Sequence, residues 1–135
     1  MAYKINEIDG IGPAYREKLT AAGIKTTDDL LDQCCTPKGR KAASETTGVS
    51  EKMLLEWSNM ADLMRVSGVG RQFAELLEAS GVDTIKELRH RNADNLATKM
   101  GEVNEEKKLS KATPNVDMIK DWIAQAQKTD PKIEY

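Results

Sequence analysis

The apolar residues of the chain recur every three or four positions, which is the spacing of amphipathic helices. One stripe runs through Leu54, Trp57 and Ala61, and a second runs through Ile119 and Trp122. β-branched residues never alternate with polar ones over the length of a strand. The pattern therefore predicts an all-α chain.

The chain repeats itself at a constant offset. Residues 8–30 read IDGIGPAYREKLTAAGIKTTDDL, and residues 66–88 read VSGVGRQFAELLEASGVDTIKEL, without a gap. A full apolar pattern and three glycines stay in register, which indicates a repeated structural unit. We therefore divide the chain into residues 1–63 and 64–135. We expect two tandem helical bundles related by internal duplication, packed together or joined near Leu63–Val66.

Local signals predict the same elements in each half. In the first half, Gly10 and Gly12 form a tight turn, Pro13 occupies the first turn of a helix, and Gly23 ends that helix. Thr26 or Thr27 then caps a second helix, a short third helix follows, and a longer fourth helix carries the apolar stripe. The second half is expected to follow the same plan.

The second half departs from this plan in one stretch, Glu105–Pro114, which has no counterpart in the first half. We expect one helix to end at Gly101 and Asn104 to cap an extra polar helix. The lysines of the stretch (Lys107, Lys108 and Lys111) fit a solvated face or a connecting turn. The tail Thr129–Tyr135 is expected to be frayed.

The composition and charge of the chain limit the classes of function that we expect. The 135 residues include 20 basic and 22 acidic side chains, for a net charge of −2, so the chain is not coated in basic charge. No apolar run is long enough to span a membrane, and Met1–Asp9 lacks the apolar core of a signal peptide. The two cysteines are adjacent, which suits free thiols in a reducing cytoplasm. We therefore expect a cytoplasmic protein with no membrane partner.

Each half opens with two glycines flanking an apolar residue, directly before a helix: Ile8–Gly12 and Val66–Gly70. This segment resembles the helix-hairpin-helix motif of nucleic-acid-binding proteins. In such a turn, unpaired backbone N–H groups and the helix dipole form an anion site, and glycine lets a phosphate approach closely. The backbone is held and the bases are not read.

The resemblance extends over nearly the whole chain. Its two glycine turns, the segments GIKTTDDL and GVDTIKEL, and the ending NEEKKL with DWIAQA are similar to the bacterial family called domain of unknown function 4332. The resemblance implies an all-helical fold with helix-hairpin-helix-like repeats. Related double-hairpin domains usually bind nucleic-acid duplexes without catalysing a reaction. The resemblance therefore implies duplex DNA as the favoured partner.

Carried over to this chain, the resemblance implies two phosphate-binding turns: Gly10, Ile11 and Gly12 in the first half, and Gly68, Val69 and Gly70 in the second, followed by Arg71 and Gln72. The second turn is the better phosphate site, because the first has an acidic neighbour, Asp9, and loses one donor to Pro13. Basic residues that could support binding are Lys38, Arg40, Lys41, Arg65, Arg89 and Arg91.

A structural role for the glycine turns is an equally good interpretation, since they also pack helices compactly. The near-neutral charge favours a second hypothesis, in which the same scaffold is a protein-interaction adaptor. No catalytic constellation, cofactor motif or metal site can be assembled, so we expect no enzyme and no cofactor. His90 lies between two arginines, Cys34 and Cys35 have no histidine partner, and core packing is favoured over base stacking for Trp57 and Trp122.

Overall fold

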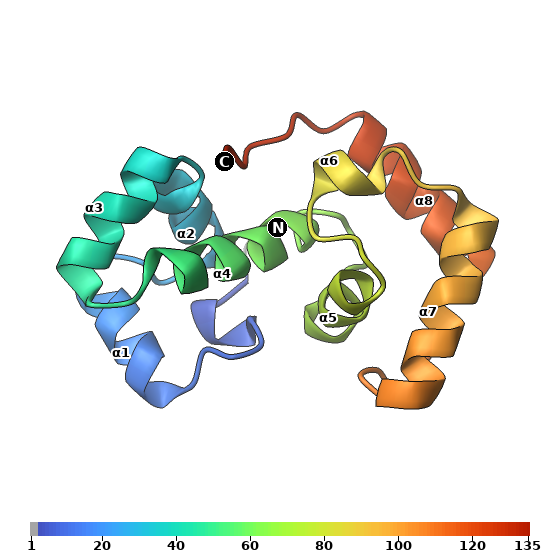
Figure 1. Ribbon diagram of the computed structural model, residues 1–135, viewed down its shortest axis with the longest axis horizontal. Coiled ribbons are helices and arrows are strands. Elements are labelled where there is room, and N and C mark those ends of the chain that lie inside the picture. Colours follow the sequence, from blue (N-terminus) through green and yellow to red (C-terminus); the bar gives the residue numbers. More distant parts are fainter. Residues whose placement is uncertain (1–2) are drawn as a thin grey trace.

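The computed structural model describes residues 3–135, and its regular structure is helical throughout that range (Figure 1). One isolated β-bridge, between Lys4 and Thr26, is the exception. The prediction of an all-α chain is confirmed. The elements are η1 (Ile5–Glu7), α1 (Pro13–Ala21), α2 (Thr27–Cys34), α3 (Pro37–Thr47), α4 (Glu51–Leu63), α5 (Arg71–Ala79), α6 (Ile85–Leu88), α7 (Ala93–Lys107) and α8 (Val116–Gln127).

The two halves present the same series of elements. Helices α1 to α4 are followed by α5 to α8, and matching helices begin with matching signals. Thr26 and Thr84 cap α2 and α6, each accepting a hydrogen bond from the backbone N–H three residues on. Figure 1 shows α1–α3 at one end of the molecule and α6–α8 at the other, with α4 and α5 between them.

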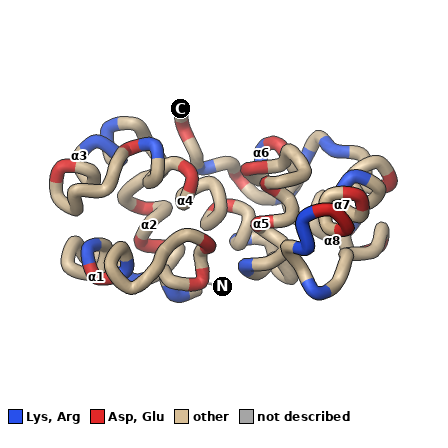
Figure 2. The backbone as a smooth tube through the Cα atoms, turned by 60° about the horizontal axis from the view of Figure 1, so that its bottom comes forward, with Lys and Arg blue, Asp and Glu red and all other residues tan. Residues whose placement is uncertain are grey.

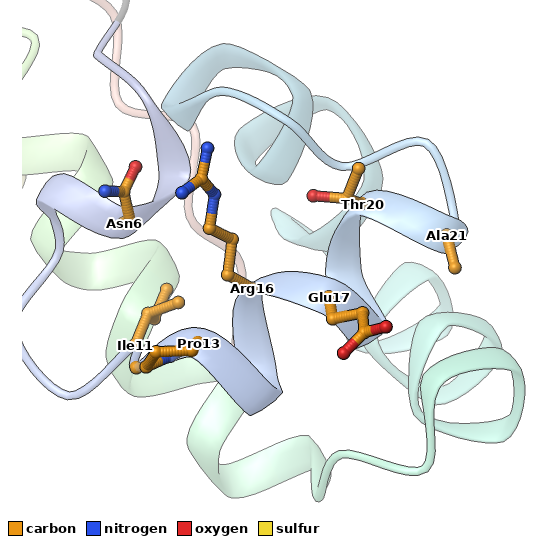
Figure 3. Close-up of a pocket in the computed structure, with 8 residues that line it drawn as sticks. Asn6, Ile11, Pro13, Arg16, Glu17, Thr20 and Ala21 are labelled. Carbon is orange, nitrogen blue, oxygen red and sulfur yellow. The ribbon is translucent and has the colours of Figure 1, made fainter.

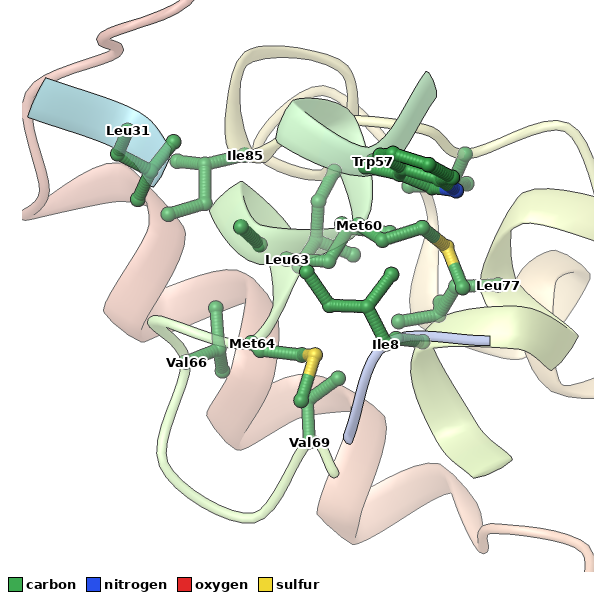
Figure 4. Packing of buried hydrophobic residues seen from close by; sticks show 14 of the residues in the cluster. Ile8, Leu31, Trp57, Met60, Leu63, Met64, Val66, Val69, Leu77 and Ile85 are labelled. Atoms are coloured by element: carbon green, nitrogen blue, oxygen red, sulfur yellow. The ribbon is translucent and has the colours of Figure 1, made fainter. Parts of the chain in front are cut away.

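Helix α4 joins the halves through one continuous core. Its buried residues include Leu54, Met60 and Leu63, which belong to a hydrophobic cluster drawn from the whole chain. In Figure 4, residues of α4 pack among side chains of both halves, with Ile8 and Leu31 from the first and Leu77 and Ile85 from the second. The halves therefore share their core, and α4 is its centre.

Each glycine turn is closed by a tryptophan from the fourth helix of its own half. Gly10 has a φ of +93° and Gly68 a φ of +94°, a region that side chains rarely adopt. A methyl group at Gly10 would lie 3.4 Å from Nε1 of Trp57, and one at Gly68 would lie 3.2 Å from Nε1 of Trp122. The backbone conformation favours glycine at both positions, and at Gly68 the space is tight as well.

The tryptophans are core residues, only 5% and 2% exposed at Trp57 and Trp122. Each packs on the aromatic residue of the helix that follows its glycine turn. Ring centroids are 5.2 Å apart both for Tyr15 with Trp57 and for Phe73 with Trp122. Such pairs stabilise a core beyond their buried area. These indoles are not available to stack on bases.

A buried carboxylate fixes α4 to the second half. Asp62 is 1% exposed and accepts hydrogen bonds from the backbone N–H of Ile85, at 2.8 Å, and from Nη1 of Arg65, at 2.7 Å. The first bond satisfies an amide at the start of α6 that has no acceptor within its own helix. Asp62 thus supplies an acceptor from another helix to the first residue of α6, which is only four residues long.

The predicted break between Gly101 and Asn104 is wrong. Helix α7 runs without interruption from Ala93 to Lys107. The side chain of Asn104 caps no helix; it accepts from the backbone N–H of Ser110 and donates to the carbonyl of Ser110. The helix ends instead at Lys107, and the C-cap residue Lys108 has a φ of +53°. Because Leu96, Met100 and Val103 continue one buried stripe, packing outweighs the weak helix propensity of glycine.

The tail after α8 has no regular structure, but hydrogen bonds attach it to the rest of the chain. The prediction that this tail is frayed is therefore wrong. Figure 1 shows it passing from α8 back to the first half. The backbone N–H of Glu134 donates to the carbonyl of Cys35 at 2.7 Å, and the carbonyl of Glu134 accepts from Nη2 of Arg40 at 2.6 Å. Arg65 donates to the carbonyl of Asp130. The sequence could not show these partners, which lie up to 99 residues apart.

Substitution of the two glycines of the second turn should separate their roles. We expect Gly68→Ala to lower the free energy of unfolding by about 2 kcal/mol, because alanine is strained at this φ and its methyl group meets Trp122. Gly70→Ala should cost less than about 1 kcal/mol, since a methyl group there meets nothing within 4 Å. Urea unfolding followed by tryptophan fluorescence measures both. Equal losses of stability in the two variants would contradict these different roles of Gly68 and Gly70.

Removal of the buried carboxylate of Asp62 should destabilise the folded protein at the start of α6. We expect Asp62→Ala to lower the free energy of unfolding by about 3 kcal/mol, because it leaves the Ile85 amide and Nη1 of Arg65 without an acceptor. Asp62→Asn should cost clearly less, because the amide oxygen can still accept from Ile85. The matched urea titrations would refute the role of Asp62 if the two variants were equally stable.

Candidate nucleic-acid interface

The second glycine turn leads directly into α5 with no side-chain cap. Gly70 is the N-cap residue, in an extended conformation, and it carries no side chain that could accept from the first turn of α5. The first-turn amides of a helix have no intrahelical acceptor, and they face the positive end of the helix dipole. The N-terminus of α5 therefore presents donors to an anion.

The structure places Val69, the middle residue of the second turn, in the core. Its side chain is fully buried, and its backbone N–H donates to the carbonyl of Val66 at 3.0 Å within the turn. The same holds for Ile11, which is 5% exposed and donates to Ile8 at 3.2 Å. The middle residue of each turn anchors it in the core, while the flanking glycines lie nearer the surface.

A groove of about 500 Å³ lies over the start of α5, and two cations line it. Arg71 comes from α5 itself, and Lys111 comes from the loop after α7. The side-chain carbonyl of Gln72 holds this loop, accepting from the backbone N–H of Lys111 at 3.1 Å and from the hydroxyl of Ser110 at 3.3 Å. Glu7 also lines the groove and adds a negative charge.

Lys111 lies at this candidate site but could not be predicted there, because its stretch of sequence fits a solvated face or a connecting turn. No sequence signal pairs it with Gln72 of α5, which lies 39 residues away. The resemblance implied that Gln72 binds phosphate. In the structure, its side-chain oxygen accepts hydrogen bonds from the loop after α7. Arg71 is half exposed and forms an ion pair with Asp9 at 3.2 Å, so the first turn partly neutralises it.

Most of the arginines chosen from the sequence have structural partners. Arg40 is 5% exposed and donates to the carbonyls of Cys34 and Glu134, so it is not available to a phosphate, contrary to the prediction. Arg65 pairs with Asp62. The guanidinium of Arg89 donates to three carbonyls at the end of α8: those of Ala126, Gln127 and Thr129.

Arg91 has a similar role. It pairs with Glu87 at 2.6 Å and donates to the carbonyl of Gly81 at 2.8 Å. Lys38 and Lys41 are exposed on α3, which lies at the far end of the molecule from α7 (Figure 1). The structure therefore does not bring the predicted supporting residues together around the second turn.

The first turn has the backbone of the second but a different chemical environment. Gly12 is an extended N-cap residue without a side-chain cap, as Gly70 is. Pro13 follows it and removes one amide donor. Asp9 stands beside the turn and pairs with Arg71. The first turn thus has one amide donor fewer than the second and an acidic neighbour.

Acidic residues meet where α4 and α5 face each other. Glu56, Glu78 and Asp83 line a small groove with Asn59. Burial raises the pKa of Glu78, and the charges of Glu56, Asp83 and Asp9 raise it further. Burial and Asp9 likewise raise the pKa of Glu75. This surface repels phosphate, and in Figure 2 acidic and basic segments alternate along both halves.

Cys34 and His90 are the other residues whose side chains the sequence singled out for their chemistry. Burial raises the pKa of the Cys34 thiol to about 11, so this side chain is inert at neutral pH. His90 is exposed after α6. Among residues 3–135, no group of three or more His, Cys, Asp or Glu side chains is placed to hold a metal ion. None of the helices in this range is long and apolar enough to cross a membrane.

These features define an all-helical protein in which two uncapped glycine turns each open a helix. The family model for the domain of unknown function (DUF4332) matches residues 9–129, and the chain belongs to this family. The match includes both turns and ends at Thr129, before most of the tail. No curated protein and no solved structure matches the chain.

The acidic contact between α4 and α5 should destabilise the protein at neutral pH. Because the pKa of Glu78 is raised by folding, the folded state binds protons more tightly than the unfolded state, and stability falls as the pH rises through this range. We expect Glu78→Gln to raise the free energy of unfolding at pH 7. The gain should vanish below about pH 3, where the carboxyl group is protonated in both states.

Urea titrations at several pH values measure this effect. Glu102→Gln, at an exposed position of α7, is the matched control and should leave stability nearly unchanged. A Glu78→Gln variant that is less stable than the parent at pH 7 would contradict the repulsion.

Proposed function

We propose that this protein is a nonenzymatic binding protein that holds the backbone of nucleic acid without reading its sequence. The binding element is the second turn, where the first-turn amides of α5 lie beside Arg71 and Lys111. This convergence of amide donors and two cations on one groove carries the proposal. A phosphate in this position would accept from the amides and be neutralised by the cations.

Gly70 supports this proposal because it leaves the groove open. A methyl group on Gly70 would meet nothing within 4 Å, so the fold itself does not require glycine there. A ligand that approaches the backbone does require it. With two cations in the groove, binding should be weak, and the logarithm of the affinity should fall with the logarithm of salt concentration with a slope of about −2.

The second candidate function is that of a protein-interaction adaptor. It is favoured by one observation: Arg40, Arg65, Arg89 and Arg91 all bond to groups within the chain, which leaves few cations for a duplex. For either function we infer the cytoplasm as the compartment, because two adjacent free thiols suit a reducing environment.

The nucleic-acid proposal predicts a salt-sensitive titration. A labelled duplex of about 25 base pairs should show rising fluorescence anisotropy with protein at low salt, and the binding should weaken as salt increases. Arg71→Glu and Lys111→Glu should each lower the affinity about tenfold, because each replaces an attraction to phosphate by a repulsion. Gly70→Ala should lower it to a similar extent while the protein stays folded.

Matched variants in the first half provide the controls. Gly12→Ala is likewise open to a methyl group, and Lys38→Glu makes the same charge change on exposed α3. Both should leave the affinity close to that of the parent. A flat titration at low salt would reject nucleic-acid binding, and equal losses in Gly12→Ala and Gly70→Ala would reject the second turn as its site.

A further inference from the structure

The tail (residues 129–135) is held by arginines that bond to its backbone. Three guanidinium groups, one on α3, one just after α4 and one just after α6, donate to its carbonyl oxygens: Arg40 to Glu134 at 2.6 Å, Arg65 to Asp130 at 3.1 Å and Arg89 to Thr129 at 3.1 Å. These arginines come from both halves. The tail therefore passes a series of positive charges on its way from α8 to the first half (Figure 1).

Arg40 is buried without a counter-charge. It is 5% exposed, and its guanidinium bonds only to two neutral acceptors, the carbonyls of Cys34 and Glu134. Among residues 3–135, no carboxylate forms an ion pair with it. A buried charge without a partner charge is costly, and an ionised acceptor makes a hydrogen bond about twice as strong as a neutral one. A carboxylate in the position of the Glu134 carbonyl would therefore bind Arg40 more strongly than the tail does.

Two carboxylates lie near the end of the tail, but neither neutralises Arg40. Burial raises the pKa of Tyr135, the charges of Asp83 and Asp62 raise it further, and the charge of Arg40 lowers it. Asp62 is bonded to Arg65 at 2.7 Å, and Asp83 is exposed to solvent. The three arginines along the tail outnumber these two acids, so the path of the tail keeps a positive charge.

The groove beside α1 has no comparable charge. It has a volume of about 620 Å³, and its lining includes the apolar Ile11 and Pro13 together with Arg16 and Glu17 (Figure 3). One basic and one acidic side chain cancel, so this groove favours neither an acidic nor a basic ligand. The site at Arg40 differs because its charge is both buried and unpaired.

The tail itself is attached by few contacts. From Asp130 onward, only Ile133 has a side chain that packs against the core, and the other side chains are exposed. Among residues 130–135, one backbone N–H finds an acceptor in the described part of the chain, that of Glu134 with the carbonyl of Cys35. Segments with few buried contacts open at a low free energy. A ligand with a stronger bond to Arg40 can therefore displace the tail.

We propose that the tail occupies a docking site for an extended peptide segment of a partner protein, which places a carboxylate on Arg40 where the tail places the carbonyl of Glu134. The tail is then an autoinhibitory contact. A partner binds by displacing it, and the tail competes at the high effective concentration of a tethered ligand. The site is formed by α3 and the end of α2, not by the second turn, so it does not depend on nucleic-acid binding.

The test adds a peptide to the full chain carrying a released tail. Ile133→Ser and Glu134→Pro together remove the packed side chain and the N–H that donates to Cys35. Two peptides have the sequence of residues 128–134 of the parent chain; one ends in a free carboxylate and the other in an amide. Each is titrated into the isotope-labelled protein, and amide chemical shifts are recorded by nuclear magnetic resonance.

The carboxylate should decide the affinity. We expect saturable shifts at Cys35 and Arg40, with a Kd on the order of 1 mM for the carboxylate peptide and about tenfold higher for the amide. The parent chain should bind the carboxylate peptide about tenfold more weakly than the released-tail chain does, because its own tail competes.

Charge removal in the protein identifies the contact. In the released-tail chain, Arg40→Gln should make the two peptides bind alike, whereas Lys52→Gln, which removes an exposed charge on α4, should keep the difference between them. Because the peptides differ only in their terminal group, their comparison decides the proposal even if Arg40→Gln does not fold.

Four results would overturn the proposal. They are equal binding of the two peptides to the released-tail chain, equal binding of the carboxylate peptide to the parent and released-tail chains, and shifts that are absent up to about 10 mM peptide or confined to other surfaces. The fourth is a duplex that shifts the Cys35 and Arg40 amides when the carboxylate peptide does not, which would assign the site to phosphate.

Discussion

The burial of α4 in both halves is the constraint on which the rest of the structure depends. This one helix places Trp57 against the first glycine turn and Asp62 at the start of α6, so it supports an element on each side. Its Met60 and Leu63 lie in the core that both halves share. A helix buried on several faces cannot turn without disturbing each of its contacts. The relative position of the two turns therefore follows from the packing of α4.

The two turns show how one backbone supports different surface chemistry. Their φ angles differ by one degree at Gly10 and Gly68, and each is closed by an indole. What differs is the environment: a lysine-bearing loop covers the second turn, while an open apolar groove extends from the first. The surface chemistry at each turn thus depends on the segments packed around it, in keeping with the general rule that function resides in sites built on a fold.

Much of the fold could be predicted from the sequence, because its signals are local. The apolar stripes, the glycine that ends each first helix and the threonine caps depend on neighbours within four residues. The end of α7 was predicted wrongly where a local signal, Gly101, conflicted with a stripe that continues through Val103. For the candidate site, the second turn and Arg71 were identified from the sequence, but Lys111 was not.

The sequence alone determined most of the helices and the two glycine turns, since each follows from residue type and short spacing. Only the tertiary structure decided which charges remain free. Arg40 and Arg89 find backbone carbonyls tens of residues away, and Arg71 finds Asp9 in the other half. A charge takes part in binding only if the fold leaves it unpaired, and long-range packing determines its partners.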